Sequence, residues 1–186
     1  KLINEYNFPK TTNKIVFNRQ INNCGIFVFQ IILNDLKKQT HSVESIKETL
    51  ESFYKTNMKQ DELEKQLNAE NKIWDIYEDV YEYILSSEYF ITMLDITTLC
   101  YIYKIPVILL LSKKKISDEK NNVIVFNPLK NNILKEYYVI RLGSNKKTRG
   151  QPVSIALYES KTNSILFDSK LFSDVFKEIM NLQNYD

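Results

Sequence analysis

The pattern of hydrophobic and polar positions divides the chain into a helix-patterned half followed by a strand-patterned half. Apolar residues recur at helical spacing, or fill a run of helical length, in five segments. These segments are residues 24–35, 41–57, 61–67, 73–85 and the first part of 93–111. In the second segment Ser42 stands just before the apolar stripe, which is typical of a helix N-cap.

Strand-like runs, rich in β-branched and aromatic residues and bounded by Asn, Gly or Pro, dominate the second half. They comprise the end of 93–111 and residues 121–128, 136–143, 152–160 and 164–170. The turn at 159–163 predicts a hairpin, and an amphipathic pattern over 171–182 predicts a last helix. Helices that precede the strands predict an α/β (α+β) fold in which the helices pack on a mixed, mostly sequential β-sheet.

Size and composition favour one folded domain over residues 1–186, with residues 1–18 as an N-terminal arm in which 15–17 would form a short strand or extended chain. Of the 186 residues, 44% are hydrophobic, and no apolar run reaches the length of a membrane span. The chain begins with Lys1 and shows no signal-peptide pattern, so we expect it to be part of a larger parent protein. Abundant Asn, Lys and Ile favour a viral or AT-rich eukaryotic source.

Charge and cysteine content argue against several classes of function. The 25 basic and 23 acidic residues leave a net charge of +2, which gives no reason to expect nucleic acid or a membrane as a partner. Two cysteines do not make a disulfide framework, which favours a reducing, intracellular and most simply cytoplasmic location. One histidine and two distant cysteines cannot supply zinc-site spacing, and no cofactor-binding motif is present.

Cys24 is the strongest candidate for chemistry, because it stands at the start of the apolar segment 24–35. At a helix N-terminus the backbone N–H groups and the helix dipole favour the thiolate, and the N–H of Gly25 would help to line an oxyanion hole. The alternative is that Cys24 is a small apolar residue at the beginning of a core helix. The apolar surroundings of Cys100 predict that this second cysteine belongs to the core.

His41 is the single histidine, and a cysteine nucleophile normally needs an imidazole as its base. Its position in a polar turn, just before the helix pattern of residues 41–57, favours a surface loop instead. His41 therefore stays an alternative candidate for the catalytic base.

Four segments together resemble the ovarian-tumour (OTU) family of cysteine proteases, most of which are deubiquitinases. The stretch "NNCGIFVFQII" is similar to the family's Asp-Gly-Asn-Cys-Leu-Phe motif, with Asn23 and Cys24 at the Asn-Cys positions. The stretch "EYFITMLDITTLCYIYKIPVILL" is similar to the family's Trp-Gly-Gly helix and Ile-Pro-Ile strand. A helix, "HSVESIKETLESFY", and two strands with their turn, "PVSIALYESKTNSILFDSK", complete the family order. The resemblance covers residues 21–170 and implies a papain-type cysteine-protease fold.

The chain departs from this family at positions that matter for catalysis. The family's Asp, three residues before the nucleophile, is Ile21 here, and Tyr-Phe-Ile at residues 89–91 replaces Trp-Gly-Gly. The resemblance puts Lys161 in the slot of the catalytic His and Asn163 in that of the orienting Asn or Asp. A lysine amine is protonated near neutral pH unless it is buried or crowded by other cations, so Lys161 is a poor replacement.

The resemblance therefore implies a catalytic set of Cys24, Lys161 and Asn163 in a degenerate OTU-like domain with impaired or no peptidase activity. Such a pseudoenzyme would be an interaction module for ubiquitin or a ubiquitin-like protein. Two alternatives stay open: an active deubiquitinase with His41 or Lys161 as an unconventional base, and a structural domain of a large assembly. The stretch "NCGIFVFQ" is also similar to SUMO- and adenovirus-type proteases, but in those a His precedes the Cys and here none does.

Overall fold

The computed structural model of the chain describes residues 13–18, 23–69, 77, 79–111, 123–128, 134–144 and 152–172. The predicted last helix lies outside these residues beyond position 172, as does most of the predicted N-terminal arm. The elements, in chain order, are β1 (Asn13–Asn18), α2 (Cys24–Lys37), α3 (Val43–Asn57), α4 (Gln60–Ala69), α5 (Val80–Leu85), α6 (Met93–Tyr103), β2 (Val107–Leu111), β3 (Val123–Phe126), β4 (Glu136–Ser144), β5 (Pro152–Glu159), β6 (Leu166–Asp168) and the 3-10 helix η3 (Ser169–Phe172).

The strands form one mixed sheet in the order β1-β5-β4-β2-β3, with β6 paired to β4. The β2–β4 pair is parallel, and the other pairs are antiparallel. A mixed sheet is therefore confirmed. Neighbouring strands are consecutive in the chain at β2–β3 and β4–β5, so the order is less sequential than predicted. Because β1 pairs with β5 along its whole length, this part of the predicted arm is a strand.

The turn between β5 and β6 does not form the predicted hairpin. Ile140 of β4 lies opposite Leu157 of β5, and Tyr138 of β4 lies opposite Leu166 of β6. Both strands therefore run antiparallel to β4 along the same edge. Residues 160–164 make a tight excursion between them, closed by a hydrogen bond of 2.8 Å from the Ser160 N–H to the Ser164 carbonyl. The hairpin prediction is wrong because β4, and not β5, is the partner of β6.

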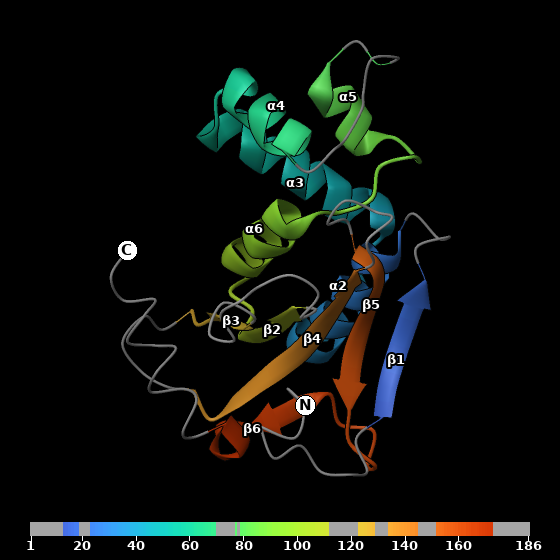
Figure 1. Cartoon of the computed structure of the whole chain (residues 1–186), viewed down its shortest axis with the longest axis vertical. Coiled ribbons are helices and arrows are strands. Elements are labelled where there is room, and N and C mark those ends of the chain that lie inside the picture. Colours follow the sequence, from blue (N-terminus) through green and yellow to red (C-terminus); the bar gives the residue numbers. More distant parts are fainter. Residues whose placement is uncertain are drawn as a thin grey trace.

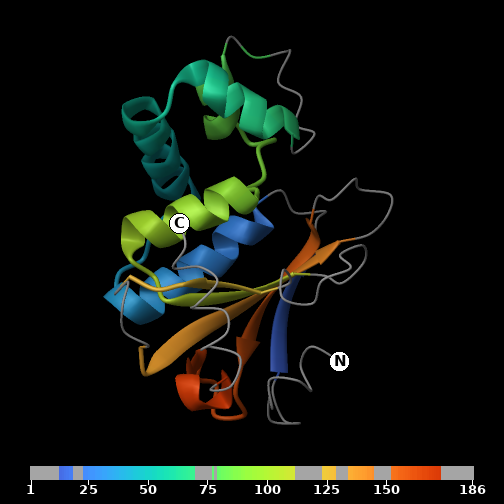
Figure 2. The same ribbon diagram turned by 60° about the vertical axis from the view of Figure 1, so that its left-hand side comes forward.

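Helices α2 and α6 lie between the sheet and a second group of helices, α3, α4 and α5 (Figure 1, Figure 2). Helix α2 contacts β1 and β5, α6 contacts β3, and α3 touches both α2 and α6. The apolar segment predicted as a buried helix is α2, and its Ile26, Phe29 and Ile32 are fully buried. Burying each such side chain stabilises the fold by about 1.5–3 kcal/mol. The start of α2 is thus fixed against the sheet by the core.

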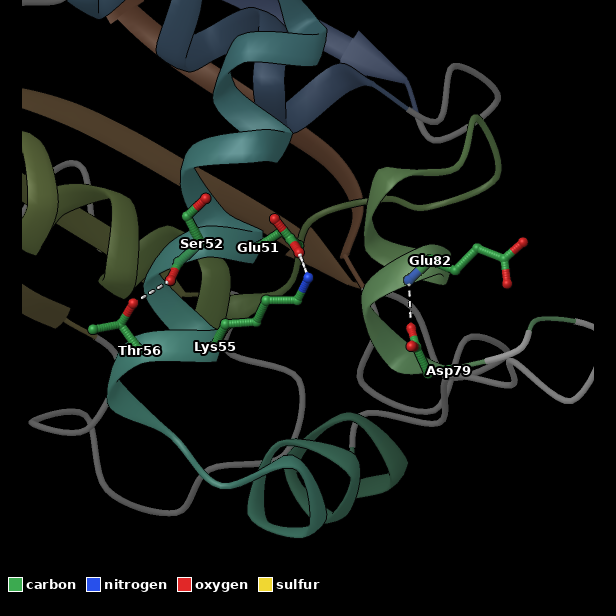
Figure 3. A network of polar contacts seen from close by, with 6 residues as sticks. All are labelled: Glu51, Ser52, Lys55, Thr56, Asp79 and Glu82. Atoms are coloured by element: carbon green, nitrogen blue, oxygen red, sulfur yellow. Dashed lines mark hydrogen bonds and ion pairs between the residues drawn. The ribbon is translucent and has the colours of Figure 1, made fainter.

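Local caps decide where two helices begin. Ser42 caps α3 as predicted, since its hydroxyl accepts a hydrogen bond of 3.0 Å from the Ser45 N–H. Helix α5 begins later than the predicted start at residue 73, because Asp79 caps it and accepts from the Glu82 N–H at 2.8 Å (Figure 3). On α3, Figure 3 also shows the ion pair between Lys55 and Glu51, which are one helical turn apart. Tyr77 lies in a bend before the Asp79 cap.

Candidate functional site

Cys24 is the first residue of α2, and its partly buried side chain faces a small apolar cavity. This cavity, the Cys24 pocket, is lined by Cys24, Gly25, Phe90, Ile91, Ile96, Leu142 and Ile155. Its walls thus come from the first turn of α2, the segment that leads into α6, α6 itself, the end of β4 and the start of β5. The cavity volume is about 20 Å³. That is enough for about one water molecule.

Gly25 allows Ile91 to pack directly on the backbone of α2. A Cβ at position 25 would lie 2.3 Å from Cγ1 and 2.5 Å from Cδ1 of Ile91. Carbon atoms in contact stay about 3.5–4.0 Å apart, so a larger residue at position 25 would collide with Ile91. Ile91 is 4% exposed and forms a wall of the Cys24 pocket.

The environment of Cys24 opposes formation of the thiolate. Burial raises the pKa of the Cys24 thiol above its ordinary value, and the N–H groups of Gly25 and of Cys24 itself lower it in part. Asn23, the N-cap residue, makes no side-chain cap hydrogen bond and therefore does not occupy the Gly25 N–H. The helix N-terminus therefore lowers the pKa of the Cys24 thiol, as predicted, but desolvation of the thiol raises this pKa by more.

Cys100 lies in the middle of α6 and is 3% exposed. Burial raises the pKa of its thiol as well. This confirms the prediction that Cys100 is a core residue, and it leaves Cys24 as the cysteine with a partly accessible sulfur.

The turn that carries Lys161 and Asn163 lies at the other end of α2. Asn163 lines a separate, more open groove there. The residues of this groove are Ile31, Asn34, Asp35, Lys38, Glu159, Asn163 and Ile165. Lys161 is exposed in the turn beside it. Neither Lys161 nor Asn163 lines the Cys24 pocket.

The helix and the strand each give the size of this separation. Asn34 is ten residues after Cys24 along the helix, which corresponds to about 15 Å at 1.5 Å per residue. Glu159, in the groove, is four residues after Ile155, in the Cys24 pocket, which corresponds to about 13 Å of strand. The predicted contact of Cys24 with Lys161 and its neighbours is therefore absent from this structure.

The physical reason for this difference is the course of β5, which runs along α2 and leads away from Cys24. The strand that begins beside Cys24 is β5, because Ile155, close to its start, lines the pocket. The resemblance to the OTU family puts the catalytic slot in the turn after β5, where the sequence predicts a hairpin. Because β5 runs along α2, that turn is carried away from Cys24 to the C-terminal end of the helix.

His41 lies in the loop that joins α2 to α3, also away from Cys24. The side-chain amide of Gln30 donates to the His41 carbonyl at 2.8 Å, and the His41 ring packs edge-on against Tyr103 with centroids 5.6 Å apart. His41 Nδ1 lies 3.2 Å from the carbonyl oxygen of Gln39. These contacts keep His41 beside the second half of α2, so it does not line the Cys24 pocket.

A buried polar cluster, not predicted from the sequence, lies next to the Cys24 pocket. The Asp95 carboxyl accepts hydrogen bonds from the hydroxyls of Tyr54 and Tyr89, both at 2.5 Å, and from the Thr92 N–H at 2.8 Å. The Thr92 hydroxyl accepts from the Asp95 N–H and completes a capping box at the start of α6. These four residues are the Asp95 cluster. The Thr-x-x-Asp spacing before an apolar helix is the local signal that would have revealed half of it.

The described ranges hold neither a metal-ligand cluster nor a helix that could span a membrane. No group of three or more His, Cys, Asp or Glu side chains there is arranged to hold a metal ion. No helix in those ranges combines the length and apolar character needed to cross a membrane. Both cysteines of the chain are free thiols.

Solved structures with the same arrangement of helices and strands define the fold. An OTU domain in complex with ubiquitin matches with a TM-score of 0.52 and 14% sequence identity, over 94% of this chain and 92% of that one. An OTU deubiquitinase from Wolbachia pipientis wMel matches with a TM-score of 0.51 and 11% identity, over 90% of this chain and 98% of that one. No protein-family model and no curated protein matches the sequence. The chain therefore has an OTU-like α+β fold, as predicted; identities this low establish the fold alone.

Proposed function

We propose that this chain is a catalytically impaired OTU-like domain that binds ubiquitin or a ubiquitin-like protein. The observation that carries the proposal is the environment of Cys24, whose thiol begins α2 but faces apolar groups and has a pKa raised by burial. A cysteine nucleophile needs a neighbouring base or a lowered pKa. The choice of ubiquitin as partner rests on the fold, because an OTU domain of this fold was solved in complex with ubiquitin.

The alternative is an active cysteine deubiquitinase with Cys24 as nucleophile. It is supported by the N–H groups of Gly25 and Cys24, which interact with the sulfur and lower the thiol pKa in part. The same N–H groups are suited to stabilise an oxyanion. The base would have to come from residues other than Lys161 and His41, since neither lines the Cys24 pocket.

A covalent probe separates these two proposals. Ubiquitin with a vinyl-type electrophile at its C-terminus is incubated with the wild-type chain and with Cys24→Ala, and adducts are detected by intact mass spectrometry. We expect no adduct with either protein. An adduct that forms with the wild type and is lost in Cys24→Ala would establish the active enzyme instead.

Reversible binding is measured in a separate titration of isotope-labelled ubiquitin followed by NMR. We expect the same saturable shifts with the wild type and with Cys24→Ala, because binding does not need the thiol. An unrelated protein of the same net charge controls for non-specific contacts. If ubiquitin shows no shifts beyond those of this control, it is not a partner of the domain.

A further inference from the structure

Ile91 forms the wall of the Cys24 pocket that rests on Gly25. It contacts the backbone of α2 at Gly25, where the space left does not accommodate even a Cβ. With Phe90 beside it, it leaves a cavity of about 20 Å³ next to the Cys24 thiol. A water molecule fits such a space. A peptide segment does not, unless Ile91 moves away from Gly25.

The Asp95 cluster holds the chain on both sides of Ile91. Two residues before it, the Tyr89 hydroxyl donates to Asp95 at 2.5 Å; one residue after it, the Thr92 N–H donates to the same carboxyl at 2.8 Å. Tyr54, from α3, donates to the other oxygen at 2.5 Å. Asp95 is fully buried, so breaking these bonds would leave polar groups unsatisfied in the core.

We infer that Ile91 blocks the Cys24 pocket and that Asp95 is the positioning residue that keeps Ile91 there. The inference rests on the proposed function and names the residue that decides what reaches Cys24 from this side: water fits beside Ile91, and an extended peptide tail does not. Ile91 also excludes solvent from the sulfur, which adds to the desolvation that raises the thiol pKa. Removing the Ile91 side chain should therefore make Cys24 both more accessible and more acidic.

Labelling with iodoacetamide, read by peptide mass spectrometry, measures this block without ubiquitin. Cys100 is an internal reference, because a core thiol reacts only when the fold opens. The test variants are Ile91→Ala and Ile91→Val. The matched control is Ile84→Ala, which truncates a fully buried isoleucine of α5 outside the Cys24 pocket. Both truncations to alanine lower the free energy of unfolding by about 2–5 kcal/mol, so Ile84→Ala controls for the loss of stability alone.

We expect the Cys24 labelling rate, after subtraction of the Cys100 rate that reports opening of the fold, to rise about tenfold in Ile91→Ala, because the sulfur becomes accessible and a larger fraction of it is thiolate. A smaller rise is expected in Ile91→Val, which keeps the test valid if the alanine variant does not fold. In Ile84→Ala the Cys100 rate should rise with the loss of stability, and the subtracted Cys24 rate should not change. An unchanged subtracted rate in the Ile91 variants, or the same rise in Ile84→Ala, would overturn the block.

The role of Asp95 is tested through Tyr89, which precedes Ile91 by two residues and does not line the pocket. In Tyr89→Phe the bond to Asp95 on this side of Ile91 is lost, and we expect the pH midpoint of Cys24 labelling to fall. Tyr103→Phe is the control, since it removes a hydroxyl 3.3 Å from Thr49 outside the cluster. An unchanged midpoint in Tyr89→Phe would overturn positioning by Asp95. If the wild type does not bind ubiquitin, only the proposed function is contradicted, because labelling does not depend on ubiquitin.

Discussion

The Asp95 cluster and the Cys24 pocket share the segment that leads into α6, but they surround their ionisable groups differently. Asp95 is fully buried, and the Tyr54 hydroxyl, the Tyr89 hydroxyl and the Thr92 N–H all point at its carboxyl. Cys24 is only partly buried, yet its pocket is mainly apolar and the groups that favour its charged form are backbone N–H groups. The two sites therefore differ in the number of side-chain donors aimed at the ionisable group, and not only in its burial.

The largest effect on the difference between these two sites is expected for a substitution of Asp95. We expect Asp95→Ala to lower the free energy of unfolding by about 3–5 kcal/mol, because two buried tyrosine hydroxyls lose their acceptor and α6 loses its capping box. Urea unfolding measures the loss. Asp79→Ala, which removes a more exposed cap from α5, should cost only about 1 kcal/mol. If the two variants lose the same free energy of unfolding, the hydrogen bonds of the buried tyrosine hydroxyls to the Asp95 carboxyl do not stabilise the fold.

The apolar pocket is tested next by Gly25→Ala. The added methyl group would collide with Ile91, and we expect a loss of about 1–3 kcal/mol. In the Ile91→Ala background the collision is gone, so the same change should be neutral or stabilising by about 0.5–1 kcal/mol, since alanine favours helix over glycine. The double-mutant cycle in urea unfolding gives the coupling between the two positions. Additive effects would show that Ile91 does not rest on Gly25.

Tyr138 is an intermediate case, in which a single tyrosine hydroxyl donates a hydrogen bond to a carboxyl group. Its hydroxyl donates to Asp35 at 2.7 Å, so Tyr138→Phe should cost about 1 kcal/mol near neutral pH. Burial, and then the hydrogen bond to Asp35, raise the Tyr138 pKa. With the folded pKa above the unfolded one, the stabilising contribution is complete below the unfolded value and is lost as the pH rises through the folded one. Unfolding at alkaline pH should therefore be less pH-dependent in Tyr138→Phe than in the wild type.

The smallest effect is expected for Cys24→Ala. A thiol in an apolar pocket behaves as a small hydrophobic group, so the change in stability near neutral pH should stay within about 1 kcal/mol. Because the folded pKa of Cys24 is raised, the wild type should lose stability relative to the variant as the pH rises above about 8.5, the ordinary thiol value. Parallel pH curves for the two proteins would show that burial does not raise this pKa.

Local signals in the sequence were sufficient for most helices and strands and for the position of Cys24. The length of the apolar run predicts α2, and Ser42 predicts the start of α3, because both depend on residues that are close in the chain. The same reasoning would have identified Thr92 and Asp95 as a capping box. Tyr54 is 41 residues from Asp95, and no local pattern connects them.

The positions of Lys161 and Asn163 relative to Cys24 were not predictable in the same way. Which end of β5 lies beside Cys24 depends on how β5 packs on α2 and pairs with β1. Both of these segments are far from β5 in the chain. The turn with Lys161 resembles a hairpin turn locally, although it joins two strands that both pair with β4. The larger parent protein and the reducing, intracellular location stay predictions of the sequence.

The excursion between β5 and β6 also offers a place to modify the protein. Lys161 and Thr162 are exposed, and the register of the strands on either side is fixed by β4. An inserted affinity tag or fluorophore-binding peptide should therefore leave both strands in register. Because this turn and Cys24 lie at opposite ends of α2, a reporter placed there would follow the domain through a reaction or a binding experiment while the thiol stays untouched.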